Sequence, residues 1–333
     1  MTERSESGAI APIFVVGAGR SGTTLLRLML NEHPSIAIPS ESHFLVPLML
    51  EFSPAETLAG ATLERALDLV TSSVEWQRDF GHSVAELRAT VGAQPMTLAS
   101  FIERVFRLEV GPDAARWGDK TPANLLYVDL LLDCFPDAQV IGIVRDPRDV
   151  HLSLVPLHWF GDTTWAIGRY IARNGALLRR WSAQCPREKF RVIRYEDLVL
   201  DSERVLRELC EFLSIPFVAE MSQFHRNTQR HVQQWELDSI HQKLLRPPAT
   251  DDVARWRREG KRRDHAEIEA ITMDVIDDWG YERTLRDLSA RLLRFECRVR
   301  HHAREPGALL RANAALVRRR APIVGRRSAR SSD

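Results

Sequence analysis

A loop near the N-terminus combines glycine, hydroxyl and arginine residues in a pattern that could bind a phosphate group. Residues 17–24 read Gly-Ala-Gly-Arg-Ser-Gly-Thr-Thr. Against the nucleotide-phosphate loop G-x-x-x-x-G-K-[ST], its two glycines and Thr24 are in frame, but Thr23 occupies the lysine position. The N–H groups at the start of a helix attract an anion even without that lysine. The loop therefore predicts phosphate binding, with Arg20 as its cation, and disfavours nucleoside triphosphate chemistry.

A second anion site is indicated in the middle of the chain. Arg145 ends an apolar run, and Ser153 follows eight residues later, about two turns along the helix that Asp146 and Pro147 are expected to open. A guanidinium fork and a hydroxyl suit a phosphomonoester. An ion pair at a strand end and a serine on a helix surface are the alternative interpretation.

The candidates for proton transfer and charge stabilisation lie in two polar segments. Glu41, which follows Arg20 by 21 residues, could act as a general base if burial raises its pKa toward the working pH. His43 is the competing base. Lys120 is a second candidate cation, and Asp119 could orient it. An ordinary helix-start glutamate and a solvated loop lysine are the alternatives.

These residues need a scaffold of alternating strands and helices. Three apolar runs rich in β-branched residues predict buried strands, at 12–17, 138–144 and 189–194. Helical spacing or N-cap signals follow these runs, for helices over 23–32, from Asp146 and Pro147, and over about 202–213. A further N-cap signal, at Thr121 and Pro122, predicts a helix before the run at 138–144. This alternation predicts an α/β fold with a mostly parallel central sheet and helices on both faces.

The sequence also predicts how the chain is divided into a domain, an insertion and two terminal segments. Residues 1–10 are expected to be a flexible N-terminus, residues 11–290 the α/β domain, and residues 291–333 a basic, helical and partly disordered tail. Within the domain, 44–115 is expected to be a helical insertion that forms an acceptor pocket or lid. Apolar residues could line such a pocket or pack in the core: Phe44, Leu45, Val46, Leu48, Met49 and Leu50. Helices are expected there at 58–70, 84–90 and 98–110.

Composition narrows the function classes. The chain has 333 residues, 44% of them apolar and 27% charged, which is ordinary globular usage. Four widely spaced cysteines and the lack of an H-E-x-x-H pattern predict no metal site. No signal sequence or apolar span is visible, so a cytoplasmic protein is expected. No nucleic-acid partner is expected. Residues 284–333 carry thirteen arginines against four acidic residues, so a contact with an anionic surface is the alternative to a solvated tail.

The loop and its helix, residues 17–34, resemble the 5′-phosphosulfate-binding loop of sulfotransferases that use 3′-phosphoadenosine-5′-phosphosulfate (PAPS). The resemblance implies a P-loop-containing nucleotide-binding fold. It also implies that the donor co-substrate PAPS is held by the loop, by Arg145 and Ser153 at the 3′-phosphate, by Tyr195 near the adenine, and by Arg257 in a closing segment. The implied loop contacts are Gly19, Arg20, Ser21, Gly22, Thr23 and Thr24.

The same resemblance implies catalytic roles. Glu41 lies at the interval of the catalytic glutamate in the tyrosylprotein branch, Lys120 lies close to the interval of its lysine, and Arg20 would stabilise the leaving oxygen. Leu25 stands where cytosolic members stack a tryptophan on adenine, which places the chain nearer the Golgi-like and bacterial branch. The implied reaction is sulfuryl transfer to a hydroxyl of a small molecule, lipid or saccharide. A P-loop kinase or NTPase and a non-catalytic nucleotide-binding scaffold are the alternatives.

Overall fold

A computed structural model describes residues 11–111, 114–160, 163–228, 232 and 242–304. The expected flexible N-terminus at 1–10 and the tail beyond residue 304 lie outside these residues.

Five parallel strands form the central sheet, in the order β2-β5-β1-β6-β7. Three of them match the apolar runs of the sequence. The strands are β1 (Ile13–Gly17), β2 (Ile36–Ala37), β5 (Arg116–Asp119), β6 (Gln139–Val144) and β7 (Phe190–Arg194). Because all run the same way, the loop after β1 and the residues after β6 and β7 meet at one edge of the sheet.

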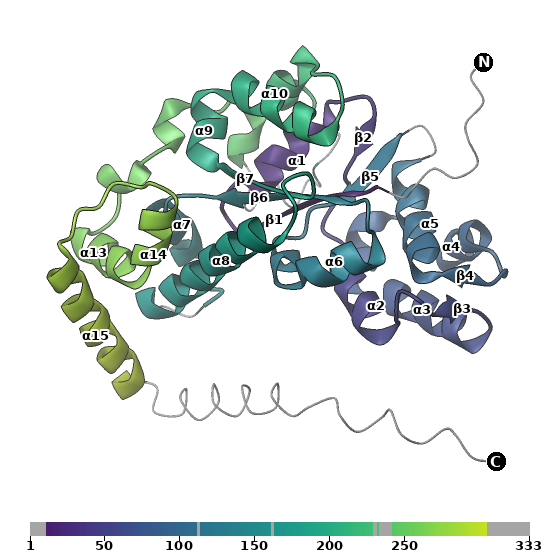
Figure 1. The fold of residues 1–333 in the computed structure, drawn as a ribbon, viewed down its shortest axis with the longest axis horizontal. Coiled ribbons are helices and arrows are strands. Elements are labelled where there is room, and N and C mark those ends of the chain that lie inside the picture. The colour runs from purple at the N-terminus through teal and green to yellow at the C-terminus, as the bar shows by residue number, and fades with distance from the viewer. Residues whose placement is uncertain (1–10, 112–113, 161–162, 229–231, 233–241, 305–333) are drawn as a thin grey trace.

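Helices cover both faces of the sheet (Figure 1). One face carries α1 (Thr23–Asn31), α9 (Tyr195–Leu200) and α10 (Ser202–Leu213), and the other carries α6 (Val128–Cys134) and α8 (Thr164–Gln184). Alternate residues of β1 supply the two cores, because successive side chains of a strand point to opposite faces. Phe14 and Val16 join the core beneath α8, whereas Ile13 and Val15 join the core beneath α1. The predicted α/β class is confirmed.

Residues 44–111 form a helical lobe beside β2 and β5 (Figure 1). Its elements are α2 (Leu45–Glu51), β3 (Thr57–Leu58), α3 (Ala61–Thr71), a π-helical turn (Trp76–Phe80), α4 (Val84–Val91), β4 (Met96–Thr97) and α5 (Leu98–Val110). The helices expected at 84–90 and 98–110 are confirmed, and the one expected at 58–70 begins three residues later because β3 pairs antiparallel with β4.

The apolar residues after Glu41 do not line a pocket. Phe44 is 1% exposed and packs against the rings of Trp76, Phe80 and Phe106. The others are buried in the same core, except Leu50, which is exposed to solvent. Core packing, not an acceptor pocket, is what this run of residues provides.

Two details around residue 120 differ from the prediction. Thr121 stands at the expected N-cap position before Pro122, but its hydroxyl makes no capping hydrogen bond and donates to Asp119 Oδ1 at 3.2 Å. A 3₁₀ segment (Pro122–Tyr127) follows, and α6 begins only at Val128. The strand β5 was not predicted, because Arg116–Asp119 contains one large apolar residue, Trp117, and no apolar run.

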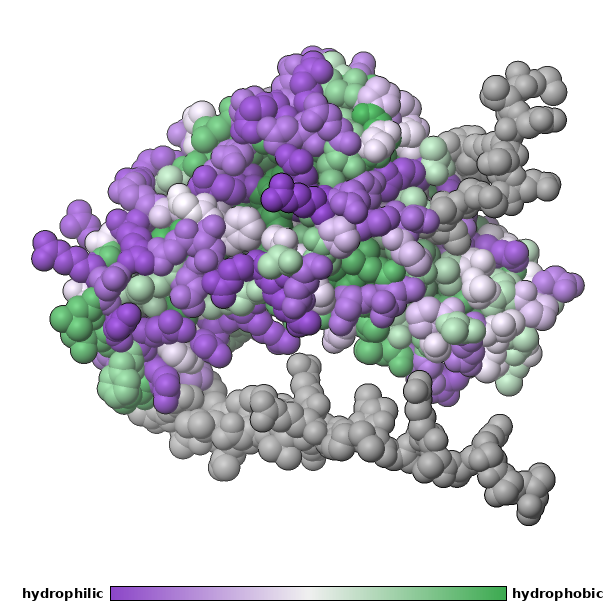
Figure 2. Space-filling view, viewed as in Figure 1, coloured by the Kyte–Doolittle hydropathy of each residue, from purple (hydrophilic) through white to green (hydrophobic). Residues whose placement is uncertain are grey.

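The C-terminal part continues from α7 (Pro147–Leu154) and a 3₁₀ turn (Val155–Leu157). After α10, short 3₁₀ segments lead to α13 (Arg262–Ile271), α14 (Met273–Asp278) and α15 (Asp287–Arg304). These segments are Ala219–Arg226, Gln242–Leu245, Thr250–Asp252 and Arg255–Arg257. Figure 2 shows hydrophobic side chains gathered on the surface of α15, at the lower left. In the described ranges, no helix is long and apolar enough to cross a membrane.

Candidate active site

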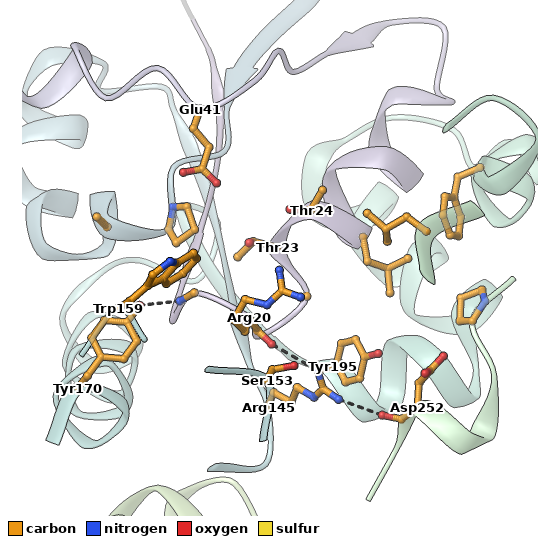
Figure 3. A pocket seen from close by; sticks show the side chains of 18 of the residues that line it. Arg20, Thr23, Thr24, Glu41, Arg145, Ser153, Trp159, Tyr170, Tyr195 and Asp252 are labelled. Carbon is orange, nitrogen blue, oxygen red and sulfur yellow. Dashed lines mark hydrogen bonds between the residues drawn. The ribbon is translucent and has the colours of Figure 1, made fainter. Parts of the chain in front are cut away.

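A cavity of about 720 Å³ opens at the carboxyl edge of the sheet, around the loop after β1 (Figure 3). Figure 3 shows Glu41, Trp159 and Tyr170 on one side of Arg20, and Arg145, Tyr195 and Asp252 on the other. The cavity therefore has two ends that meet at the loop. Most of the predicted donor-site residues line it: Gly19, Arg20, Gly22, Thr23, Thr24, Arg145, Ser153 and Tyr195.

The start of α1 has the features that favour anion binding. Gly22 occupies the N-cap with φ 102° and provides no side-chain cap, so the N–H groups of Thr23 and Thr24 have no acceptor within the helix. Glycine is required at position 22 for two reasons: its φ is positive, and a Cβ there would lie 2.4 Å from Tyr195 Cδ2. Hydrogen-bond donors and the helix dipole together favour a phosphate at this position.

Arginines crowd the same end of the cavity. Arg20 has a left-handed backbone, φ 71°, and its side chain lines the cavity with Arg145 and Arg255. Burial lowers the pKa of Arg20, and the positive charges of Arg145 and Arg255 lower it further. A bound anion would relieve this repulsion, so the arrangement favours a ligand with more than one negative group.

Arg145 is fixed by its neighbours but keeps a free donor. It donates to the carbonyl oxygens of Arg20 at 3.3 Å and Asp252 at 3.0 Å, and its guanidinium stacks 4.1 Å from the centre of the Tyr195 ring. Its buried Nε has no hydrogen-bond partner among the described residues. Ser153, on α7, lines the same cavity. Arg145 and Ser153 thus lie together at this end of the cavity, as the sequence predicts.

Tyr195 is placed by the acid that follows it. Glu196 is buried, accepts a hydrogen bond from the Asp146 N–H at 2.9 Å and another from the Tyr281 hydroxyl at 2.9 Å. Burial raises the pKa of Glu196. Glu196 therefore joins the turn after β6 to the turn after β7, which is a structural role.

Glu41 lies at the other end of the cavity in a chain of polar contacts. Its Oε1 accepts from Lys120 Nζ at 2.5 Å, and its Oε2 lies 3.0 Å from His43 Nε2. Burial raises the pKa of Glu41, but the Lys120 ammonium and the His43 hydrogen bond outweigh burial and bring it to about 2. The rise toward neutral pH expected of a general base is therefore not found. Its hydrogen bond to the Glu41 carboxylate raises the pKa of His43.

No hydrogen bond or ion pair joins Asp119 to Lys120 among the described residues. Asp119 is buried, and it accepts from the Ser42 N–H at 3.2 Å and from Asn124 Nδ2 at 2.8 Å. Burial raises the pKa of Asp119. Its contacts join the segment that carries Glu41 to the one that carries Lys120, so Asp119 positions the pair through the backbone.

Three predicted residues lie outside the cavity lining. Ser21 is 1% exposed beneath the loop, and Lys120, also 1% exposed, reaches the cavity only through Glu41. Arg257 pairs with Glu282 on the surface, half exposed, whereas Arg255 lines the cavity. The structure therefore does not bring Arg257 to the site.

Two aromatic residues at the site, Tyr170 and Trp159, belong to no motif that the sequence reveals. Tyr170, on α8, accepts a hydrogen bond from the Gly19 N–H at 2.6 Å through its hydroxyl. That hydroxyl has no acceptor for its own proton among the described residues. Trp159 lines the cavity beside it and is 56% exposed. Only the fold brings both to the loop, which lies far from them in the chain.

Four apolar residues also line the cavity, and of these only Leu25 was singled out in the sequence. They are Leu25, Phe224, Leu244 and Pro248. No cluster of three or more histidine, cysteine, aspartate or glutamate side chains arranged to hold a metal occurs within the described ranges.

Comparison with known proteins places this geometry in a family. The sequence profile of the sulfotransferase family matches residues 12–220. An uncharacterised protein of Aquifex aeolicus is 27% identical over 75% of this chain and 31% of its own length. Protein-tyrosine sulfotransferase A of Caenorhabditis elegans is 23% identical over 73% of this chain and 60% of its own. The chain thus spans less than two thirds of these relatives.

Solved structures share the fold. The sulfotransferase domain of the Synechococcus PCC 7002 olefin synthase is 21% identical, with a TM-score of 0.57 over 85% of this chain and all of that one. The sulfotransferase domain of the curacin biosynthetic pathway is 21% identical, with a TM-score of 0.55 over 83% of this chain and 99% of that one. With the profile match over most of the chain, these findings establish that the chain belongs to the sulfotransferase family.

Proposed function

We propose that this protein transfers the sulfuryl group of PAPS to a hydroxyl of an acceptor. One observation carries the proposal: a single cavity joins an anion site without the ATPase lysine to a carboxylate and lysine pair. The anion site is the start of α1 with Arg20 and Arg145, and the pair is Glu41 with Lys120. Membership of the sulfotransferase family supports the same reaction.

The donor fits the cavity group by group. The N–H groups of Gly22, Thr23 and Thr24 would hold the 5′-phosphate, and the free Nε of Arg145 with Ser153 would hold the 3′-phosphate. The adenine would lie against Tyr195 and the apolar wall of Leu25, Phe224 and Leu244, which supplies the contact that a tryptophan at position 25 would otherwise make. PAPS supplies a sulfuryl group on an anhydride oxygen that leaves as part of a stable phosphate.

The transfer exchanges one S–O bond for another. The acceptor oxygen bonds to sulfur as the bond from sulfur to the 5′-phosphate oxygen breaks, and adenosine 3′,5′-bisphosphate (PAP) leaves. The acceptor proton passes to Glu41, while Arg20 and Lys120 offset the charge that develops on the transferred group and the leaving oxygen.

The low pKa of Glu41 couples the two halves of the site. Because the Lys120 ammonium is the main opposing charge that lowers it, an anion that attracts Lys120 would raise the pKa of Glu41. Donor binding would therefore make Glu41 a stronger base. His43, on the other oxygen of Glu41, would hold the carboxylate in place.

Tyr170 is proposed as a hydrogen-bond donor to the sulfuryl end of the donor. Burial raises the pKa of Tyr170, so the phenol stays protonated, and the Gly19 N–H already occupies one lone pair of its oxygen. Tyr170 lies on the Glu41 side of Arg20, where the sulfuryl group would lie if the 3′-phosphate is at Arg145 (Figure 3).

The acceptor end mixes aromatic and charged side chains. Trp159 offers an exposed ring, and the wall beyond it carries His43, Glu75, Arg78 and Asp79. With the apolar run after Glu41 buried in the core, this wall favours a polar acceptor with a flat face, such as a saccharide, over a long alkyl chain.

The test is release of PAP from PAPS by the full chain with a panel of saccharide, phenol and lipid alcohols. Acceptor-dependent PAP release that is lost in Arg20→Ala supports the proposal. Absence of PAP release with every acceptor class, together with absence of PAPS binding, would reject it.

A further inference from the structure

The outer face of α15 carries a continuous apolar stripe. Leu288, Leu292, Phe295 and Val299 recur at spacings of four, three and four residues and are 50–70% exposed. That spacing places them on one side of a helix. Ala290 and Cys297, on the opposite side, are buried against the body of the protein. Figure 2 shows the resulting hydrophobic patch at the lower left, at the position of α15 in Figure 1.

Positive charge borders this stripe. Arg291 and Arg298 are exposed next to Leu292 and Val299, and neither has an ion-pair or hydrogen-bond partner among the described residues. The chain continues from α15 into residues 305–333, which contain seven arginines and two acidic residues. The whole chain has a net charge of only +1, so the positive charge is concentrated in this region.

We propose that α15 docks on an anionic lipid bilayer, with its apolar stripe in the interface and its arginines at the lipid phosphates. An apolar face bordered by arginine is the pattern of helices that lie in the membrane interface. Anionic headgroups attract a basic segment of this kind. The inference does not depend on the proposed sulfuryl transfer.

A second copy of the chain is the other occupant that the spacing allows, because steps of four and three residues also suit a coiled coil. Twofold pairing through α15 would bring two strongly positive C-terminal regions together. The repulsion between them favours the bilayer over a second copy.

The test is co-sedimentation of the full chain with vesicles of phosphatidylcholine alone, or of phosphatidylcholine and phosphatidylglycerol in equal parts. The variants are Leu292→Ser with Phe295→Ser, and Arg291→Gln with Arg298→Gln, which change exposed side chains only. Leu200→Ser, at a site 57% exposed on α9, is the matched control.

We expect the wild-type chain and Leu200→Ser to bind the anionic vesicles and not the neutral ones. Each double variant should bind the anionic vesicles at least about tenfold more weakly. If the Leu292→Ser, Phe295→Ser variant bound the anionic vesicles with wild-type affinity, the proposal would be overturned, because the apolar stripe would then not contribute to binding. Absence of wild-type binding to the anionic vesicles would also overturn the proposal. If sedimentation equilibrium then found a dimer that the Leu292→Ser, Phe295→Ser variant dissociates, the stripe would bind a second copy of the chain.

Discussion

Lys120 Nζ donates to Glu41 Oε1 at 2.5 Å, although the lysine is almost fully buried and the glutamate faces the cavity. The contact joins the turn after β2 to the end of β5, two neighbouring strands. A buried ammonium needs a partner, and here that partner is a carboxylate that lines the cavity. Under the proposed function, Glu41 would be the base for the acceptor and Lys120 the cation beside it.

Replacement of Glu41 by Gln should lower turnover by a factor on the order of 10²–10³, because the amide cannot accept the acceptor proton. PAP affinity should change little, since Glu41 lies at the end of the cavity away from Arg145. Steady-state PAP release and calorimetric PAP titration would measure the two effects. Glu203→Gln, on the exposed surface of α10, is the control. Near-normal turnover in Glu41→Gln would assign the base role to His43.

Arg145→Ala should weaken PAP binding by about tenfold to a hundredfold, because the 3′-phosphate loses a charged hydrogen bond. AMP, which lacks the 3′-phosphate, should bind the variant and the wild-type chain about equally. A loss of the same size for AMP would mean that Arg145 supports the fold and does not read the 3′-phosphate.

Arg255→Ala should also weaken PAP binding, whereas Arg257→Ala should leave it unchanged. The two residues are neighbours in one 3₁₀ turn, but Arg255 lines the cavity and Arg257 pairs with Glu282. Titration of both variants with PAP compares them directly. The reverse order of effects would favour the assignment made from the sequence alone and would require the segment to rearrange on donor binding.

Tyr170→Phe should lower turnover by about tenfold or more while PAP affinity stays within about threefold of wild type. The reason is that PAP lacks the sulfuryl group to which the hydroxyl would donate. Tyr127→Phe, at a tyrosine outside the cavity lining, is the matched control. Equal losses in PAP affinity and turnover would show that Tyr170 acts only by holding the Gly19 N–H.

Thermal stability should fall as the pH drops from about 6.5 to 4, in part through His151. Burial on α7 lowers the pKa of His151 to about 4, and neither ring nitrogen has a partner among the described residues. Between these pH values the unfolded chain binds a proton that the folded chain does not, so acid favours unfolding. His151→Leu should make the melting temperature depend less on pH over this range, whereas His158→Gln should leave the pH dependence unchanged. An unchanged slope in His151→Leu would reject this account.

Much of the scaffold was predictable because burial leaves a clear pattern. Strands β1, β6 and β7 are covered on both faces and read as continuous apolar runs. Strand β5 gave no such run, since its place between β1 and β2 comes from pairing and not from composition. The loop, Arg145 and Tyr195 were predictable because they directly follow those readable strands.

Residues brought to the site by tertiary packing were not predictable. Tyr170 lies within a long helix and Trp159 in a connecting turn, and no local spacing relates either to Gly19. The choice between Arg255 and Arg257 depends on how one 3₁₀ turn faces the cavity. The low pKa of Glu41 was not predictable, because the contact with Lys120 that outweighs burial joins residues 79 positions apart in the chain.

The central claim is that the cavity binds a 3′-phosphorylated adenine nucleotide and not a nucleoside triphosphate. The most direct measurement is thermal unfolding of the full chain with PAP, with ATP and Mg²⁺, and with GTP and Mg²⁺. At a hundredfold excess over its dissociation constant, a ligand specific for the folded state adds about 2.7 kcal/mol of stability. We predict a rise in melting temperature with PAP alone. A rise with ATP or GTP and none with PAP would contradict the claim and favour a kinase.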